Sequence, residues 1–185
     1  MKAGFLRRNG IFLLSAIMIL FCTTAYAENI DPNDDDCQYA YGENVGWLNA
    51  EPGGDGGEGV EVADSKLTGY LWAENIGWIS LSCENTSSCG TVDYGVTNDG
   101  RGNLSGYAWT ENVGWISFSC ENTSSCATVD YGVKIGPATG EFSGYAWGEN
   151  IGWVNFKSTG AVPFGVVTAW SWKLSLPWLF LLLSD

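Results

Sequence analysis

The stretch YAWTENVGWISFSC at residues 107–120 decides the fold, because close versions of it recur along the chain. The other copies are YAYGENVGWLN at 39–49, YLWAENIGWISLSC at 70–83 and YAWGENIGWVNF at 145–156. Successive copies are separated by roughly 30 to 40 residues, the length of one supersecondary unit in many repeat proteins. The sequence therefore predicts a domain of four similar units.

The word ENxGW marks a hairpin turn between two aromatic strands. In the third copy Tyr107 and Trp109 share a face of the first strand, and Ile116 and Phe118 share a face of the return strand. We expect the asparagine to cap the turn, the following Val or Ile to pack against the core, and the glycine to adopt positive φ. We assign a structural role to the repeated positions Glu43, Asn44, Gly46, Trp47, Glu74, Asn75, Gly77, Trp78, Glu111, Asn112, Gly114, Trp115, Glu149, Asn150, Gly152 and Trp153.

The aromatic residues around the turn fall into two sets. The tryptophan after the turn is present in every copy, and such repetition favours a place in the core. The aromatic residue before the turn is the better candidate for an exposed surface, since aromatic faces bind the apolar faces of sugar rings. These candidate binding residues are Tyr41, Trp72, Trp109 and Trp147.

A single strand is expected before each complete hairpin. The segments VDYGV at 92–96 and 129–133 are rich in Val and Tyr, and GVEV at 59–62 and FGVV at 164–167 are weaker versions. Turns rich in Gly, Asn and Asp separate these segments from the hairpins. Each unit is therefore predicted to be one strand followed by a hairpin, in an all-β fold.

The phase of the repeat predicts that the array closes on itself. The first hairpin lacks its leading strand, and the last strand, FGVVT at 164–168, lacks its hairpin. Pairing of Val166 and Val167 near residues 39–49 would remove two exposed sheet edges. We expect a closed propeller-like or prism-like ring, with an open stacked array of the units as the alternative.

The two ends of the chain differ from the repeats. Residues 1–27 have the basic start, apolar centre and small-residue cleavage site of a signal peptide, which predicts export. We assign 28–38 to an acidic linker, 39–168 to the four-repeat domain and 169–185 to an apolar tail.

The apolar C-terminal stretch raises the question of a membrane anchor. Residues 161–183 are long enough to span a bilayer and contain one charge, Lys173. That lysine, Pro177 within the stretch and the absence of a basic flank disfavour a membrane span.

Charge and composition exclude several classes of function. The chain has 21 acidic residues against eight basic ones, which are scattered, so nucleic acid is not an expected partner. It has no histidine, which removes histidine-dependent nucleophiles and imidazole metal sites. Four equivalent glutamates are the wrong pattern for a glycosidase, which needs two carboxylates with different roles. We therefore expect a protein that binds or assembles, and not an enzyme.

The cysteines predict two local disulfides. Cys83 and Cys89 bracket the sequence ENTSS, as do Cys120 and Cys126, which in an exported chain indicates two disulfide-closed links. A zinc site built from all four thiolates is the alternative. Cys37 is left over, either as a free thiol or as a tether to another chain.

The patterns require no cofactor, although calcium is an open alternative. The segment DPNDDD at 31–36 places Asp31, Asn33 and Asp35 at short spacing, as in calcium loops, but lacks the closing Glu of an EF-hand. A solvated acidic linker is the competing interpretation.

The sequences SGYAWTENVGWISF and SGYAWGENIGWVNF resemble a tryptophan-rich repeat of secreted and surface proteins of bacteria. The resemblance covers residues 39–168, and the first copy departs from it at Tyr41. It implies an extracellular β-rich module and offers no activity or catalytic residue to transfer. We expect a secreted or cell-surface module that recognises a glycan, or another extracellular polymer or protein, through exposed aromatics. The alternatives are a structural or assembly component of the cell envelope or extracellular matrix, and a calcium-stabilised adhesin-like module.

Overall fold

The structure is a computed structural model that describes residues 29–53 and 59–172. The expected signal peptide, and residues 173–183 of the apolar stretch, lie outside the described residues. Within the described ranges, no helix has both the length and the apolar character that crossing a membrane requires.

The four copies of the motif form four hairpins. Each hairpin has a three-residue loop, and in the third copy Thr110 pairs with Gly114 across it. The glycine that ends the loop has positive φ in every copy, as predicted, with a value of 87° at Gly114. A type I turn followed by a left-handed residue is the usual form of such a loop. The hairpins are β1 (Tyr39–Gly42) with β2 (Gly46–Asn49), β5 (Tyr70–Ala73) with β6 (Gly77–Ser80), β8 (Leu104–Thr110) with β9 (Gly114–Ser117), and β11 (Phe142–Gly148) with β12 (Gly152–Asn155).

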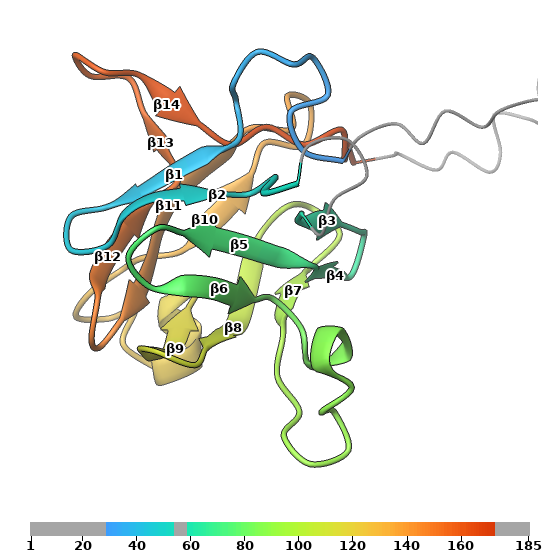
Figure 1. The fold of residues 1–185 in the computed structure, drawn as a ribbon, viewed down its shortest axis with the longest axis vertical. Coiled ribbons are helices and arrows are strands. Elements are labelled where there is room, and N and C mark those ends of the chain that lie inside the picture. Colours follow the sequence, from blue (N-terminus) through green and yellow to red (C-terminus); the bar gives the residue numbers. More distant parts are fainter. Residues whose placement is uncertain (1–28, 54–58, 173–185) are drawn as a thin grey trace, which may run out of the picture.

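The hairpins join edge to edge into a closed antiparallel barrel of eight strands. β2 pairs with β5, β6 with β8, β9 with β11, and β12 returns to pair with β1. The closing pair sets Tyr41 opposite Asn155 and Gly42 opposite Val154. In Figure 1, β1, β2, β5 and β6 lie side by side as one wall of this ring. The predicted all-β ring is confirmed, and the open array is not formed.

The inside of the barrel is filled by alternating small and large aliphatic residues. Ala108 faces Ile116 across the third hairpin, and the first and fourth hairpins also pair an alanine with a larger residue, whereas the second places Leu71 opposite Ile79. Eight strands enclose a space that such side chains can just fill. The inward pairs are Ala40 with Leu48, Leu71 with Ile79, Ala108 with Ile116, and Ala146 with Val154.

The tryptophans after the turn lie outside the barrel, so the prediction that they fill the core is wrong. Their exposed fractions are 41% for Trp47, 46% for Trp78, 42% for Trp115 and 38% for Trp153. The reason is the register. Residues directly opposite in an antiparallel pair point to the same face, and Trp109 pairs with Trp115 while Ala108 and Ile116 point inward.

The turn aliphatics close one end of the barrel. Val45, Ile76 and Ile151 are buried, as expected, while Val113 is half-buried and packs against the same core. The four turns are therefore brought together at this end.

The motif asparagine joins neighbouring units. The prediction that it caps its own turn is wrong. The side-chain amide of Asn75 donates to the backbone oxygen of Val45 in the preceding unit, at 3.1 Å. Asn112 and Asn150 make the same bond to Ile76 and Val113. Each turn is thus fastened to the turn before it.

Single strands extend the units beyond the barrel. Three of the four predicted strands begin later than expected, and the one predicted at 164–167 is a strand only over Phe164–Gly165. The segment 92–96 contributes only its last residue to a strand, and residues 92–95 run beside the barrel. The Tyr94 ring packs on Trp115 there, which holds this stretch against the outer face. The additional strands are β3 (Glu61–Val62), β4 (Lys66–Thr68), β7 (Val96–Asn98) and β10 (Val133–Ile135).

The glycine that precedes the first tyrosine of the second, third and fourth hairpins allows the neighbouring backbone to lie close to the hairpin strand. Gly106 has a φ of 84°, and a Cβ there would lie 2.1 Å from the carbonyl oxygen of Gly95. Gly69 and Gly144 face the same obstacle in their units. A side chain at these positions would push the single strand off the hairpin.

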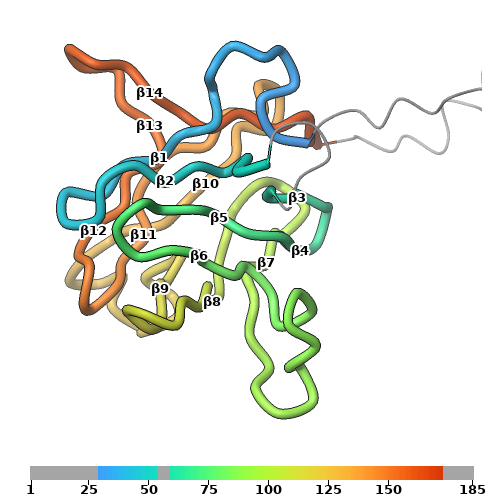
Figure 2. The backbone as a smooth tube through the Cα atoms, in the orientation of Figure 1, coloured from blue at the N-terminus to red at the C-terminus, as the bar shows by residue number. Residues whose placement is uncertain are grey.

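The two chain ends meet beside the closing pair. Val166 forms a bridge with Gln38, one residue before the range 39–49, and the Val167 amide donates to the Cys37 carbonyl at 2.8 Å. The segment expected to be an acidic linker also contacts the fold, because Ile30 is buried and bridges Thr168. A separate pair, β13 (Lys157–Ser158) and β14 (Phe164–Gly165), carries the protruding arm at the upper left of Figure 2.

Candidate functional site

Two disulfide-closed loops follow the second and third hairpins. Cys83 is bonded to Cys89 and Cys120 to Cys126, so the predicted disulfides are confirmed. The zinc alternative is not supported, because sulfur atoms bonded to each other do not act as thiolate ligands. Two disulfides indicate an oxidising, extracellular setting.

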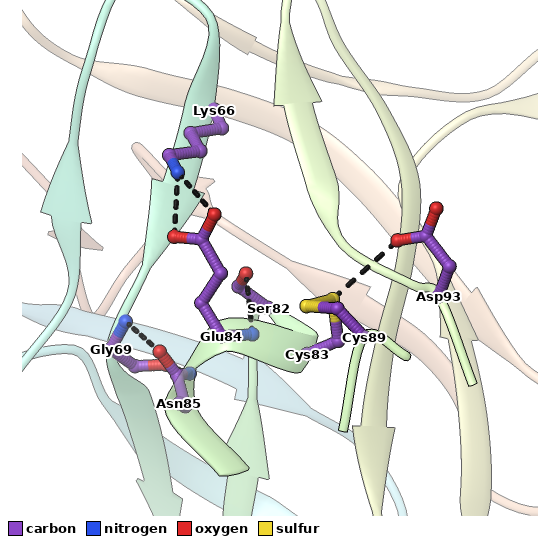
Figure 3. Close-up of polar contacts among 8 residues, drawn as sticks. All are labelled: Lys66, Gly69, Ser82, Cys83, Glu84, Asn85, Cys89 and Asp93. Carbon is purple, nitrogen blue, oxygen red and sulfur yellow. Dashed lines mark hydrogen bonds and ion pairs between the residues drawn. A yellow bond between two sulfur atoms is a disulfide. The ribbon is translucent and has the colours of Figure 1, made fainter. Parts of the chain in front are cut away.

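The first loop is fixed to the barrel by hydrogen bonds (Figure 3). The short helix η1 (Cys83–Thr86) starts where the Ser82 hydroxyl accepts from the amide of Glu84. The side chain of Asn85 accepts from the Gly69 amide at 3.1 Å and donates to the Gly69 carbonyl. Lys66 forms an ion pair with Glu84 at the surface. The loop is therefore a fixed projection, visible below β6 and β7 in Figure 1.

The second loop repeats this construction. At the start of η2 (Cys120–Thr123) the Ser119 hydroxyl accepts from the Glu121 amide. The side chain of Asn122 accepts from the Gly106 amide and donates to the Gly106 carbonyl. Both loops are therefore built by the same sequence word and stand in equivalent places on adjacent units.

A cavity of about 1110 Å³ lies along the third and fourth hairpins, and residues of the second loop and of the segments 92–95 and 129–131 also line it. Six of its lining residues are aromatic. We call it the aromatic groove and define it by its six rings, which are Tyr94, Tyr107, Trp115, Tyr131, Trp147 and Trp153.

The tyrosine rings of the groove are held by their hydroxyl groups. Tyr94 donates to the Ser80 hydroxyl at 2.9 Å, and Tyr131 donates to the Ser117 hydroxyl at 3.0 Å. Tyr107 donates to the backbone oxygen of Asn122 at 3.1 Å. These bonds orient the rings before any ligand arrives, which reduces the entropy lost on binding.

Each exposed tryptophan of the groove is braced by a tyrosine. Tyr94 meets Trp115 edge to face with ring centroids 5.4 Å apart, and Tyr131 meets Trp153 in the same way at 5.2 Å. Trp115 and Trp153 stay 42% and 38% exposed despite these contacts. Trp115 and Trp153 can therefore act as stacking platforms.

The polar groups at the groove are amides, hydroxyls and two carboxylates. Asp93, Glu149, Asn150 and Ser125 are among the lining residues, and none of the lining residues is Lys or Arg. The Asn150 amide already donates to the Val113 carbonyl at 3.0 Å, so its position is fixed. An Asp93 carboxylate oxygen lies 3.5 Å from Cys83 Sγ.

The sequence-predicted binding residues are placed unevenly. Trp147 lines the groove, whereas Trp72 is exposed outside it, and Tyr41 and Trp109 are half-buried outside it. Trp115 and Trp153, assigned a structural role, belong to the groove. Tyr94 and Tyr131 were missed, although the repeated word VDYGV contained them both.

The repeated glutamates do not converge on one site. Glu43, Glu74, Glu111 and Glu149 are all exposed, and only Glu149 lines the groove.

The acidic segment 31–36 folds on itself. Asp31 is buried, its carboxylate accepts from the Asp35 amide at 3.1 Å, and burial raises its pKa. Among the described residues, the groups of three or more His, Cys, Asp or Glu ligand atoms each contain a disulfide pair, and none of these groups includes Asp31 or Asp35. The carboxylate of Asp31 organises the turn through its hydrogen bond with the Asp35 amide.

The chain was compared with models of protein families, with curated proteins and with solved structures, and none of the three comparisons gave a match.

Proposed function

We propose that this protein is an exported binding module that holds a glycan in the aromatic groove. The single observation that carries the proposal is the groove itself, a cavity of about 1110 Å³ walled by six aromatic rings. Ligand sites of this size are usually preformed, largely apolar, and supplied with a few placed polar groups.

The chemistry of the walls suits a sugar chain. Pyranose rings have an apolar face of C–H groups, which packs on indole and phenol rings, and a rim of hydroxyls that seeks hydrogen bonds. Asn150 and Ser125 offer side-chain oxygens, and Asp93 and Glu149 offer carboxylates that accept from hydroxyls. The chain's lack of histidine favours binding over catalysis.

The proposal is tested by pull-down of the full chain with insoluble cellulose, chitin, xylan and β-1,3-glucan. We expect retention on at least one polymer, and loss of retention in Trp115→Ala and Trp153→Ala. The matched control is Trp78→Ala, because Trp78 has the same motif position and similar exposure but does not line the groove. Retention on no polymer, or equal loss in the Trp78 variant, would overturn the proposal.

A second candidate is a structural role in the cell envelope. It is favoured by the exposure of Trp47 and Trp78 outside the groove, because exposed aromatic clusters mark protein contacts. Sedimentation velocity over a range of concentrations separates the two candidates. Self-association lost in Trp47→Ala and Trp78→Ala, but not in Trp115→Ala, supports the structural role, and a monomer at all concentrations contradicts it.

A further inference from the structure

The aromatic groove contains the same pair of residues twice. Tyr94 with Trp115 forms one pair, and Tyr131 with Trp153 forms the other, one unit further along the chain. Both tyrosines are anchored to equivalent serines. The backbone oxygen of each tyrosine also accepts from the amide of the first cysteine of a disulfide, Cys83 for Tyr94 and Cys120 for Tyr131. A groove with two equivalent subsites is suited to a ligand that is itself repetitive.

In the other two units, the tryptophan after the turn forms no such pair with a tyrosine in the groove. Trp47 has Phe164 at the corresponding place, without a hydroxyl anchor, and neither ring lines the groove. The links that precede these hairpins also lack a disulfide among the described residues. The two subsites are therefore particular to the third and fourth hairpins.

The spacing of the two subsites exceeds one sugar ring. Trp115 lies on β9 and Trp153 on β12, and β11 stands between them in the sheet order. Two strand spacings amount to about 10 Å, and the stagger of the strands adds to this. That distance is about the length of a disaccharide in a β-linked chain. Trp147 on β11 lies between the two subsites and lines the same groove.

The charges of the groove select against anionic polymers. Its lining residues include Asp93 and Glu149 and no cation, and the whole chain has a net charge of −13. Uronic acid or sulfate groups would be desolvated next to like charges, which opposes binding.

We propose that the ligand is a linear, neutral, β-linked polymer of pyranoses with equatorial hydroxyls, in which Trp115 and Trp153 stack on sugars about one disaccharide apart. This inference rests on the proposed function, since it names the substrate class of the same groove. The stacking faces of such sugars are flat and apolar, as the two indole platforms require.

Two subsites on one rigid surface make affinity depend on ligand length. A disaccharide fills one subsite at a time, whereas a chain of three or more sugars reaches both. The second contact is then intramolecular and adds affinity without a second loss of translational freedom. We expect affinity to rise by about tenfold or more between the disaccharide and the hexasaccharide.

Isothermal titration calorimetry with the full chain tests this, using β-1,4-linked glucose and N-acetylglucosamine oligomers of two to six units. Trp115→Ala and Trp153→Ala should each lower hexasaccharide affinity to about that of the disaccharide in the unmodified chain, while Trp78→Ala leaves it unchanged. Trp115→Phe and Trp153→Phe keep a stacking face, so they should retain most of the affinity and serve if an alanine variant fails to fold.

The outcomes separate the inference from the function on which it rests. Equal affinity for the disaccharide and hexasaccharide, or tighter binding of oligogalacturonate of the same length, overturns the two-subsite, neutral-polymer inference and leaves glycan binding standing. Absence of binding to all oligomers together with absence of retention on the insoluble polymers overturns both.

Discussion

The side-chain amide of Asn44 donates a 3.0 Å hydrogen bond to the backbone oxygen of Ile151, which lies 107 residues further along the chain. It is the fourth member of a cycle, because the asparagines of the other three turns make the same bond to the unit before them. The first and last hairpins are thus joined by the same contact that joins sequential neighbours.

Asn44→Ala should lower the free energy of unfolding by about 1 kcal/mol, because it removes one hydrogen bond between units. Asn112→Ala should have a similar effect through the lost bond to Ile76. The measurement is urea denaturation followed by tryptophan fluorescence. The matched controls are Glu43→Gln and Glu111→Gln, which change exposed neighbours and should cost less than about 0.5 kcal/mol. Equal losses in the asparagine and glutamate variants would contradict this role of the amide.

Gly106→Ala should destabilise the fold by about 3 kcal/mol, through its positive φ and the clash of a Cβ with the Gly95 carbonyl oxygen. Gly90→Ala is the control, since a Cβ there meets nothing within 4 Å. Thermal unfolding by circular dichroism distinguishes the two. A Gly106 variant as stable as the Gly90 variant would show that the close approach is relaxed in solution.

Removal of two buried hydroxyl groups should change the stability of the fold in opposite directions. Among the described residues, Thr110 Oγ1 is buried without a hydrogen-bond partner, so Thr110→Val should stabilise the fold by about 1 kcal/mol. Ser117 Oγ accepts hydrogen bonds from the side chains of Tyr131 and Asn122 and donates one to the Ser119 carbonyl. Ser117→Ala should therefore destabilise the fold by about 1–3 kcal/mol. Chemical denaturation of both variants is the measurement, and a loss of stability in the Thr110 variant would indicate a bound water at that site.

Cys37 should make the free energy of unfolding depend on pH in the alkaline range. A hydrogen bond to the Asp35 carboxylate, together with burial, raises the pKa of the Cys37 thiol from 9.0 to about 11. Between these values the unfolded chain has lost the thiol proton while the folded chain keeps it, so stability falls as pH rises from 9 through 11.

The comparison of unmodified chain with Cys37→Ser isolates this contribution from the tyrosines and lysines that titrate nearby in pH. We expect the difference in free energy of unfolding between the two to change steadily over that interval and to be flat below pH 8. Asp35→Asn should also speed alkylation of the folded protein by iodoacetamide at pH 8, because it lowers the thiol pKa. An unchanged rate would exclude the carboxylate as the cause.

Much of the fold could be predicted because its determinants are local or repeated. The hairpin turn, the positive φ of Gly114 and the Cys120–Cys126 disulfide each follow from a few neighbouring residues. Ring closure was predicted from the phase of the repeat, which left a hairpin without its leading strand at one end and a strand without its hairpin at the other. These features need no knowledge of contacts between distant residues.

The rest depended on contacts that the pattern does not specify. The face of Trp115 follows from its register opposite Trp109, which a one-residue change in loop length would have reversed. The bond from Asn44 to Ile151 requires the closed ring to exist first. The aromatic groove requires Tyr94 and Tyr131 to pack against Trp115 and Trp153 of the hairpins that follow them, and before these contacts are known the two tyrosines could not be distinguished from ordinary strand residues.

Closure also fixes how many units this chain can contain. The diameter of a closed sheet grows with its number of strands, and here Val45, Ile76, Val113 and Ile151 cover one end of an eight-stranded interior. A fifth unit would open a hole that these side chains do not fill, and a lost unit would compress them. Open repeat arrays lengthen and shorten freely during evolution. In this protein, duplication of a unit would be selected against, and variation is expected to accumulate in the links between hairpins.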